Sequence, residues 1–274
     1  MVIDTVTKID SYAFSYSNIT SCVMNDNVQV IGAYSFSNSS IQNIELSESL
    51  FEINEGCFEK SKLEEILIPK SVRHVFEKAF YQCTYLVNVV FDEGSRLTSI
   101  GKSVFDSCER LDNIILPNEL AFIKEQAFYN CRSLRTIIIP KSVEKFDGSE
   151  VFAFCFALQE VVFEDGGLLK TIGSKCFLSC TSLKKVTFSD NITDIGGSAF
   201  EDYENLAEIS FGENVTSIGA DCISGTLYEA QNQDDMIYVG KYLVSVNQRL
   251  TGSVAVKEGT TLICDKAFYS SNVR

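Results

Sequence analysis

The chain has 274 residues, of which 37 are acidic and 23 are basic, so its formal net charge is −14. This acidity disfavours nucleic acid and anionic membranes as partners, because like charges repel. The mean hydropathy is near zero and no long apolar run occurs, so we expect no membrane insertion within this chain.

A phenylalanine recurs along almost the whole chain, with gaps of 22 to 25 residues up to Phe200. Ile223 takes the next position, and the last gap, of 45 residues, is about two periods. A period of this length marks a solenoid, in which each unit buries its apolar face against its neighbours. The column comprises Phe14, Phe36, Phe58, Phe80, Phe105, Phe128, Phe152, Phe177, Phe200 and Phe268.

Each unit contains an alternating apolar triplet that predicts a short strand. Three prolines follow directly after it and end the strand, because proline cannot donate to a ladder. They are Pro69, Pro117 and Pro140. In chain order the triplets are Leu63/Ile66/Ile68, Leu86/Val89/Phe91, Leu111/Ile114/Leu116, Leu134/Ile137/Ile139, Leu158/Val161/Phe163, Leu183/Val186/Phe188 and Leu206/Ile209/Phe211.

Ile-Gly pairs such as Ile100-Gly101 indicate a second corner, where glycine relieves a tight turn. The Ala-Phe-x-x-Cys run that follows is too short for a free-standing helix. We expect one helical or 3₁₀ turn there, which places the phenylalanine in the core.

The ten cysteines occupy positions of the repeat where a small buried residue is wanted. We therefore expect structural free thiols, with a disulfide or redox role as the alternative. Cys176 and Cys180 have the spacing of metal ligands, but no second pair at a matching distance supports a zinc site. We expect no metal and no cofactor.

Catalytic patterns are scarce. His74 is the only histidine, and we place it in a solvated turn before Val75. A carbohydrate-active enzyme that uses carboxylates of the segment 226–250, with Asp234 as the candidate, is a remote alternative. We predict no enzyme and no catalytic residue.

The middle residue between the last two apolar positions of each triplet points outward, because side chains of a strand alternate between its faces. Five consecutive members of this column are aliphatic and span roughly 19 Å. They are Leu67, Val90, Ile115, Ile138 and Val162. The column one residue earlier is polar and includes Asn88, Asn113 and Glu160.

We take these eight residues as the candidate ligand-binding site, because an apolar row beside a polar border is the anatomy of a protein interface. Two interpretations remain open, since β-branched residues also favour strands whatever they contact. The row either recognises a ligand or only stabilises the sheet.

The repeat resembles that of BspA-like leucine-rich-repeat surface proteins, the type also described from treponemes, over about residues 6–225 and 254–270. The resemblance implies a right-handed, β-rich α/β superhelix of about eleven coils, with parallel strands on the concave face. It also implies a cell-surface or secreted protein that binds a host or microbial protein. Matrix or plasma glycoproteins are the partners that this family suggests.

We expect one elongated domain over 1–274, with a variant unit at about 226–260 in which Tyr238–Leu243 form a hairpin. No leader is visible, and neither end shows the polar capping unit that a solenoid needs. We therefore expect a piece of a longer chain, or ends covered by self-association. Structural assembly through such contacts is the alternative to adhesion.

Overall fold

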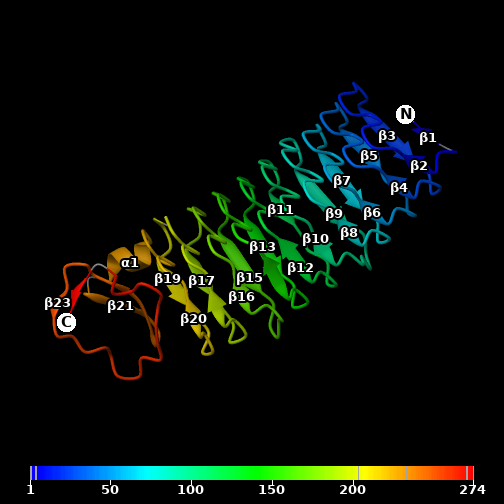
Figure 1. Ribbon diagram of the computed structural model, residues 1–274. Coiled ribbons are helices and arrows are strands. Elements are labelled where there is room, and N and C mark those ends of the chain that lie inside the picture. The colour runs from blue at the N-terminus through cyan, green and yellow to red at the C-terminus, as the bar shows by residue number, and fades with distance from the viewer. Residues whose placement is uncertain (1, 4, 203, 233, 270, 274) are drawn as a thin grey trace.

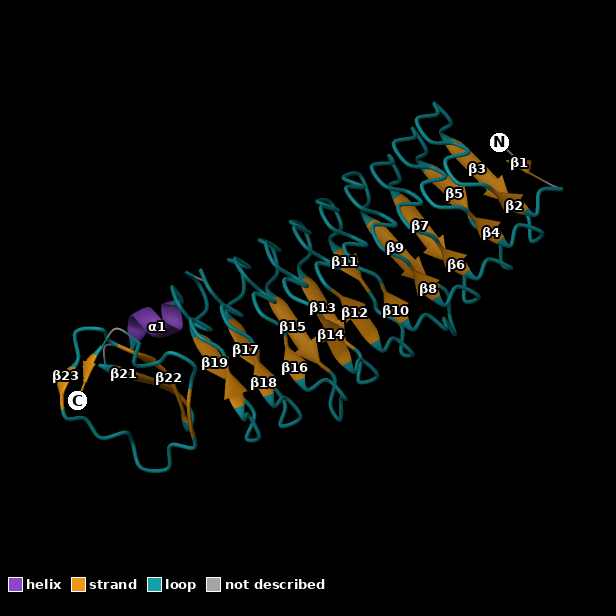
Figure 2. Cartoon of the chain, in the orientation of Figure 1, coloured by secondary structure: helices purple, strands orange, loops and turns teal. Residues whose placement is uncertain are grey.

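The computed structural model describes residues 2–3, 5–202, 204–232, 234–269 and 271–273, and it shows an elongated solenoid (Figure 1). The chain winds into about eleven parallel β-coils, as predicted, and the described residues contain almost no helix. Successive coils lie side by side along one axis, from the N-terminal end to the C-terminal end. Each coil has two short strands joined by corners, and Figure 2 shows these strands as two rows.

The first row, called here the long-strand face, contains the strands predicted from the apolar triplets. Neighbouring strands pair in parallel, as β7 and β9 do with Ile66 opposite Val89. Its members are β1 (Val2–Ile3), β3 (Ser21–Met24), β5 (Asn43–Glu45), β7 (Glu65–Ile68), β9 (Asn88–Phe91), β11 (Asn113–Ile114), β13 (Thr136–Ile139), β15 (Glu160–Phe163), β17 (Lys185–Thr187) and β19 (Glu208–Ser210).

The second row, the short-strand face, ends at the Ile-Gly corner, where no strand was predicted. It is also a parallel ladder, with strands of two or three residues. Such strands are too short for an alternating pattern to reveal. Its members are β2 (Lys8–Ile9), β4 (Val30–Ile31), β6 (Glu52–Ile53), β8 (His74–Val75), β10 (Ser99–Ile100), β12 (Phe122–Lys124), β14 (Lys145–Asp147), β16 (Thr171–Ile172), β18 (Asp194–Ile195) and β20 (Ser217–Ile218).

The segment around each phenylalanine, called here the turn face, is not the helical or 3₁₀ turn that we expected. It is a series of β-turns. In the coil of Phe128, the residues two positions before and after it, Gln126 and Asn130, both have φ of +56°. The same two positions have positive φ in every coil from Phe14 to Ile223. The left-handed conformation costs a non-glycine residue roughly 1–2 kcal/mol, so the packing around each coil offsets this strain.

Hydrogen bonds between coils hold the turn face. The Phe128 N–H donates to the Val151 carbonyl of the next coil over 2.9 Å, and the N–H groups of Gln126 and Asn130 do the same to Ser149 and Ala153. The intervening N–H groups close the turns within the coil. Every second backbone donor is therefore satisfied by the following coil, and a coil needs its neighbour to complete its hydrogen bonding.

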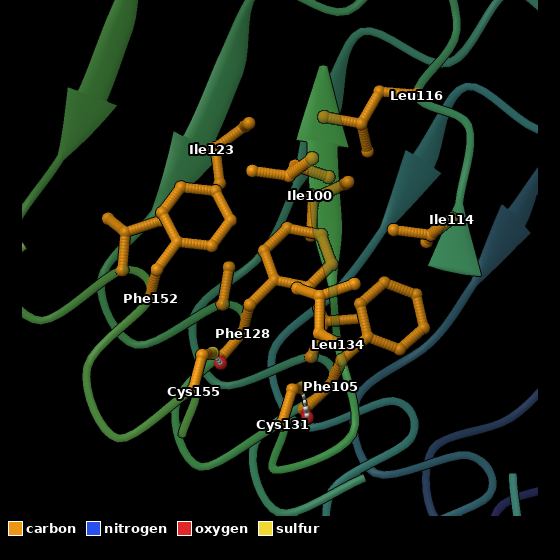
Figure 3. Packing of buried hydrophobic residues seen from close by; sticks show 14 of the residues in the cluster. Ile100, Phe105, Ile114, Leu116, Ile123, Phe128, Cys131, Leu134, Phe152 and Cys155 are labelled. Atoms are coloured by element: carbon orange, nitrogen blue, oxygen red, sulfur yellow. Dashed lines mark hydrogen bonds between the residues drawn. The ribbon is translucent and has the colours of Figure 1, made fainter. Parts of the chain in front are cut away.

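The core is a column of stacked phenylalanine rings. Adjacent rings from Phe14 to Phe200 lie 4.9 to 5.6 Å apart, nearly parallel. Phe36 and each following ring up to Phe200 are fully buried. Figure 3 shows Phe105, Phe128 and Phe152 between the isoleucine and leucine side chains of the two strand rows. Burial of an aromatic ring in every coil supplies the main stabilisation of the stack.

All ten cysteines are free and buried. In five consecutive coils the thiol donates to the phenylalanine carbonyl of the preceding coil, as Cys131 does to Phe105 over 3.1 Å (Figure 3). Burial raises the pKa of Cys57 and Cys83 to about 12, so these thiols stay protonated at neutral pH. The free-thiol interpretation is confirmed, and the cysteines are packing groups.

The regular pattern ends after β20. Thr226 caps the short helix α1 (Leu227–Gln231) by accepting from the Glu229 N–H. The remaining elements are β21 (Met236–Val239), β22 (Tyr242–Val246), β23 (Thr251–Gly252), β24 (Leu262–Ile263) and β25 (Asn272–Val273).

A hairpin lies at the place predicted, because β21 and β22 pair antiparallel around Gly240, which has φ of +61°. β22 also pairs in parallel with β24, which resumes the short-strand face. Among the described residues no helix has the length and apolarity that a bilayer crossing requires.

Candidate protein-binding face

All five aliphatic residues of the predicted row are exposed on the long-strand face. Their exposed fractions are 49% for Leu67, 44% for Val90, 77% for Ile115, 47% for Ile138 and 37% for Val162. We call them the aliphatic row. Large apolar side chains in consecutive strands seldom remain uncovered without a partner.

The strand register aligns the aliphatic row. Leu67 lies opposite Val90, and Ile138 lies opposite Val162. The row is outward because the residues on either side of each member point into the core; Ile66 and Ile68 are 2% and 0% exposed. The alternation that buries the core therefore produces the exposed row.

Ile115 is the most exposed member because its strand is the shortest there. β11 ends at Ile114, and its pairing with β13 is confined to Asn113 and Thr136. The side chain of Ile115 consequently projects from the middle of the row.

Three shallow hollows follow the long-strand face. A hollow of about 450 Å³ contains Val90 and Ile115, and another of about 470 Å³ contains Leu67. The third, of about 630 Å³, contains Val162 and Lys185. Side chains of a partner can fit into these depressions.

The polar column borders the row on one side. Asn88 lies opposite Asn113, and Thr136 lies opposite Glu160. Asn88, Asn113 and Glu160 are exposed, whereas Thr136 is half-buried. The amide and carboxylate groups can hydrogen-bond a partner around an apolar centre.

A loop with the acidic residues Asp92 and Glu93 closes one side of the hollow at Ile115. Gly94 forms the tip of this loop with φ of +73°, and Gly166 forms the corresponding loop two residues after Glu164 with φ of +71°. The loop edge is acidic, so a partner that contacts it would present basic or polar groups there.

His74 was expected in a solvated turn, and the structure places it in β8 on the short-strand face. Its Nδ1 atom lies 3.2 Å from the Ser99 hydroxyl, and its ring lies beside those of Phe51 and Phe76. Arg73 lies over the Phe51 ring at 5.6 Å. This aromatic cluster was missed because its members follow no regular spacing.

Asp234, the carboxylate considered for a glycosidase, is exposed and lines a separate cavity at the C-terminal end. Over the described ranges, no group of three or more His, Cys, Asp or Glu side chains converges to hold a metal ion. The polar cavity and the aliphatic row are therefore distinct features.

A family model matches the chain. It is described as the BspA-type leucine-rich-repeat region, with six copies, and it matches residues 7–134, 98–229 and 170–274. A search of the curated proteins found no match.

Two solved structures with TM-scores above 0.5 share the fold. The pneumococcal vaccine antigen PcpA is 20% identical with a TM-score of 0.56, over 97% of this chain and 68% of the antigen. A leucine-rich-repeat protein from Eubacterium ventriosum is 16% identical with a TM-score of 0.53, over 100% of this chain and 82% of the other. The leucine-rich-repeat protein TpLRR of T. pallidum is 26% identical with a TM-score of 0.47, over 66% of this chain and 76% of the other.

Proposed function

Because this chain belongs to the BspA-type leucine-rich-repeat family, we propose that it is a protein-binding module of a cell-surface or secreted protein. The aliphatic row and its polar border form the contact. The ligand is a host or microbial protein, and matrix and plasma glycoproteins are the first class to test. The module binds without catalysis.

The observation that carries the proposal is the aligned exposure of five aliphatic side chains on one rigid face. Each lies on or beside a strand whose inward neighbours are buried, so the row is preformed. A preformed apolar surface binds without the cost of ordering a loop. Ile115, at its centre and 77% exposed, is the expected hot spot, because the central residues of an interface carry most of the binding free energy.

The surface chemistry favours a folded protein over other ligands. A net charge of −14 disfavours nucleic acid, and the row offers no ring of hydrogen-bonding groups for a polar small molecule. Its length of roughly 19 Å suits a standard protein interface, which buries about 800 Å² on each partner.

The test is biolayer interferometry of the purified chain against matrix and plasma glycoproteins. Saturable binding to at least one is expected. The double variant Ile115→Asp/Ile138→Asp should lose it by more than about tenfold, or about 1.4 kcal/mol, because two charges would be buried without partners.

A matched control replaces two exposed apolar residues of the short-strand face, Val30→Asp/Phe122→Asp, which are 40% and 38% exposed. It should bind as the natural chain does. Circular dichroism melts establish that both variants are folded. Equal binding by both variants would remove the row from the interface, and no binding by the natural chain would contradict an adhesive role. Concentration-dependent light scattering would then favour assembly.

A further inference from the structure

The polar cavity lined by Asp234 lies at the opposite end of the molecule from β1, where the regular stack is interrupted. Its volume is about 410 Å³. One wall is the turn face of the coil of Ile223, and the other is the turn face of the coil of Phe268. Val244 and Val246 of β22 form its floor. We call this cavity the slot.

The slot occupies the place of a missing turn segment. Phe268 follows Ile223 after 45 residues, about two periods, so one coil between them has no turn face of its own. The hairpin strand β22 replaces only part of that coil. Tyr242 and Leu243 pair with β24, but the chain then continues as a strand to Val246 and does not turn. The segment that would lie between the two walls is absent.

The backbone groups on the first wall have lost their acceptors. In each earlier regular coil, two N–H groups donate to carbonyls of the next coil. One is that of the phenylalanine, and the other is that of the residue two positions before it. The corresponding donors here are those of Asp221 and Ile223, and neither has an acceptor within the described part of the chain. The third donor, the Gly225 N–H, is taken by the Glu229 carboxylate at 3.0 Å. Ile223 is only 1% exposed, so its unpaired N–H is an unusual feature of a native core.

The second wall offers the complementary acceptors. In the repeat, two carbonyls of each coil accept hydrogen bonds from the preceding coil. They belong to the residues one and three positions before the phenylalanine. For Phe268 these are the carbonyls of Asp265 and Ala267. Asp265 receives only a long contact of 3.5 Å from the Cys264 thiol, and no described donor reaches Ala267. At one end the walls meet, where the Asp265 N–H donates to Ile218 over 2.9 Å.

We propose that the slot binds a main-chain segment of another protein, which completes the ladder between the two walls. The segment would accept from the Asp221 and Ile223 N–H groups and donate to the Asp265 and Ala267 carbonyls. This is strand addition into an internal gap, with the free energy coming mainly from the backbone.

The geometry of the repeat favours glycine at two positions of the segment. In the neighbouring coil, the two positions flanking the core residue are Asp221, with φ of +58°, and Gly225, with φ of +73°. A segment that follows this path needs positive φ at the same two positions, which glycine adopts without strain.

The charge of the slot specifies the remaining residues. Its lining includes four carboxylates, Asp221, Glu229, Asp234 and Asp265, against one base, Lys266. The segment is therefore rich in lysine or arginine. The inference is independent of the aliphatic row, which lies on the long-strand face.

The probe is the peptide acetyl-Lys-Gly-Lys-Ala-Lys-Gly-Lys-amide, with its glycines at the two positive-φ positions and its alanine toward the core. Calorimetry should show saturable binding, and the Asp221 and Ile223 amides should gain protection from hydrogen exchange. The same peptide N-methylated at its first glycine and its alanine keeps its charge but loses both donors. It should bind at least about tenfold more weakly.

Protein variants separate the slot from general electrostatics. Asp221→Asn/Asp265→Asn should weaken peptide binding, whereas Glu93→Gln/Asp165→Asn removes the same charge from two distant loops and should not. Ile115→Asp/Ile138→Asp should bind the peptide normally, so failure of the proposed function and failure of the slot are distinguishable. Equal binding of the methylated peptide, equal effects of the two charge variants, or no binding at all would each overturn the proposal.

Discussion

The regular coils and the C-terminal segment 226–269 satisfy the same backbone requirements in different ways. In the regular coils, each turn is paired with the next by main-chain hydrogen bonds, and each ring is stacked on another. In the C-terminal segment, side chains do this work. Tyr242 donates to the Gly212 carbonyl over 2.7 Å and accepts from the Val215 N–H, while Glu229 accepts from Gly225.

The difference shows what regular repetition contributes. A coil that follows the pattern pairs most of its backbone groups directly with those of its neighbour, because the neighbour repeats the same donors and acceptors, and the cysteine thiols of five coils add one bond each. Where one turn segment is missing, specific residues must replace it, and they replace it only in part. What remains is the Ile223 N–H, which has no acceptor among the residues that the structure describes.

The first test of this difference removes one phenylalanine ring from each of the two regions. Phe128→Ala should lower the free energy of unfolding by roughly 3–5 kcal/mol, because it opens a cavity in the fully buried column. Phe268→Ala should cost markedly less, since Phe268 is half-buried. Urea denaturation measures both. Equal losses would mean that the column is not the main source of stability.

The second test concerns the side chains that satisfy backbone groups in the C-terminal segment. Tyr242→Phe should destabilise by about 1–3 kcal/mol, because it leaves the Gly212 carbonyl and the Val215 N–H unpaired while keeping the ring. Tyr238→Phe is the control. Its hydroxyl accepts from the exposed Lys257 N–H at 3.0 Å, and water can replace it there. A smaller effect at Tyr242 than at Tyr238 would contradict the role given to Tyr242.

The third test uses pH. Burial raises the pKa of Cys83 to about 12 from an ordinary value near 9.0, so the folded chain holds this proton where the unfolded chain releases it. The resulting stability is complete below about pH 9 and falls progressively as the pH rises from about 9 to about 12. The stability difference between the natural chain and Cys83→Ala should therefore shrink by roughly 1 kcal/mol from pH 9 to 10, because only part of the unfolded thiols is ionised at the start of this interval.

The fourth test compares the reactivity of the Cys264 thiol, in the C-terminal segment, with that of Cys83, in a regular coil. Burial raises the pKa of Cys264 to about 11, less than that of Cys83. Under native conditions Cys264 should react with a thiol reagent before the fully buried Cys83 does. Mass spectrometry of partly labelled chain identifies the site, and faster labelling of Cys83 would contradict the assignment.

Periodicity was enough to predict the solenoid, the phenylalanine column and the aliphatic row, because each depends on spacing alone. The exposure of Ile115 followed from alternation within its triplet, and the short strand β11 explains why it is greatest there. Ligand binding by the row stays a prediction.

Features made by the packing of whole coils could not be predicted in this way. The positive φ of Gln126 and Asn130 is imposed by the β-turns of their coil, and the spacing of the apolar residues does not reveal it. The short-strand face arises from two-residue strands, and the slot arises from the mismatch between a straight β22 and a coil that must turn. Each of these features becomes visible only in the three-dimensional structure.

The hydrogen bonds between coils, such as that from Phe128 to Val151, run along the axis of the solenoid. A force that pulls the ends of the molecule apart therefore acts on these bonds one coil at a time, and does not shear many together. Under tension the module should lengthen in steps, each releasing a unit of 22 to 25 residues while the remaining coils keep their structure. The total extension of the module under load would then be set by the number of its coils.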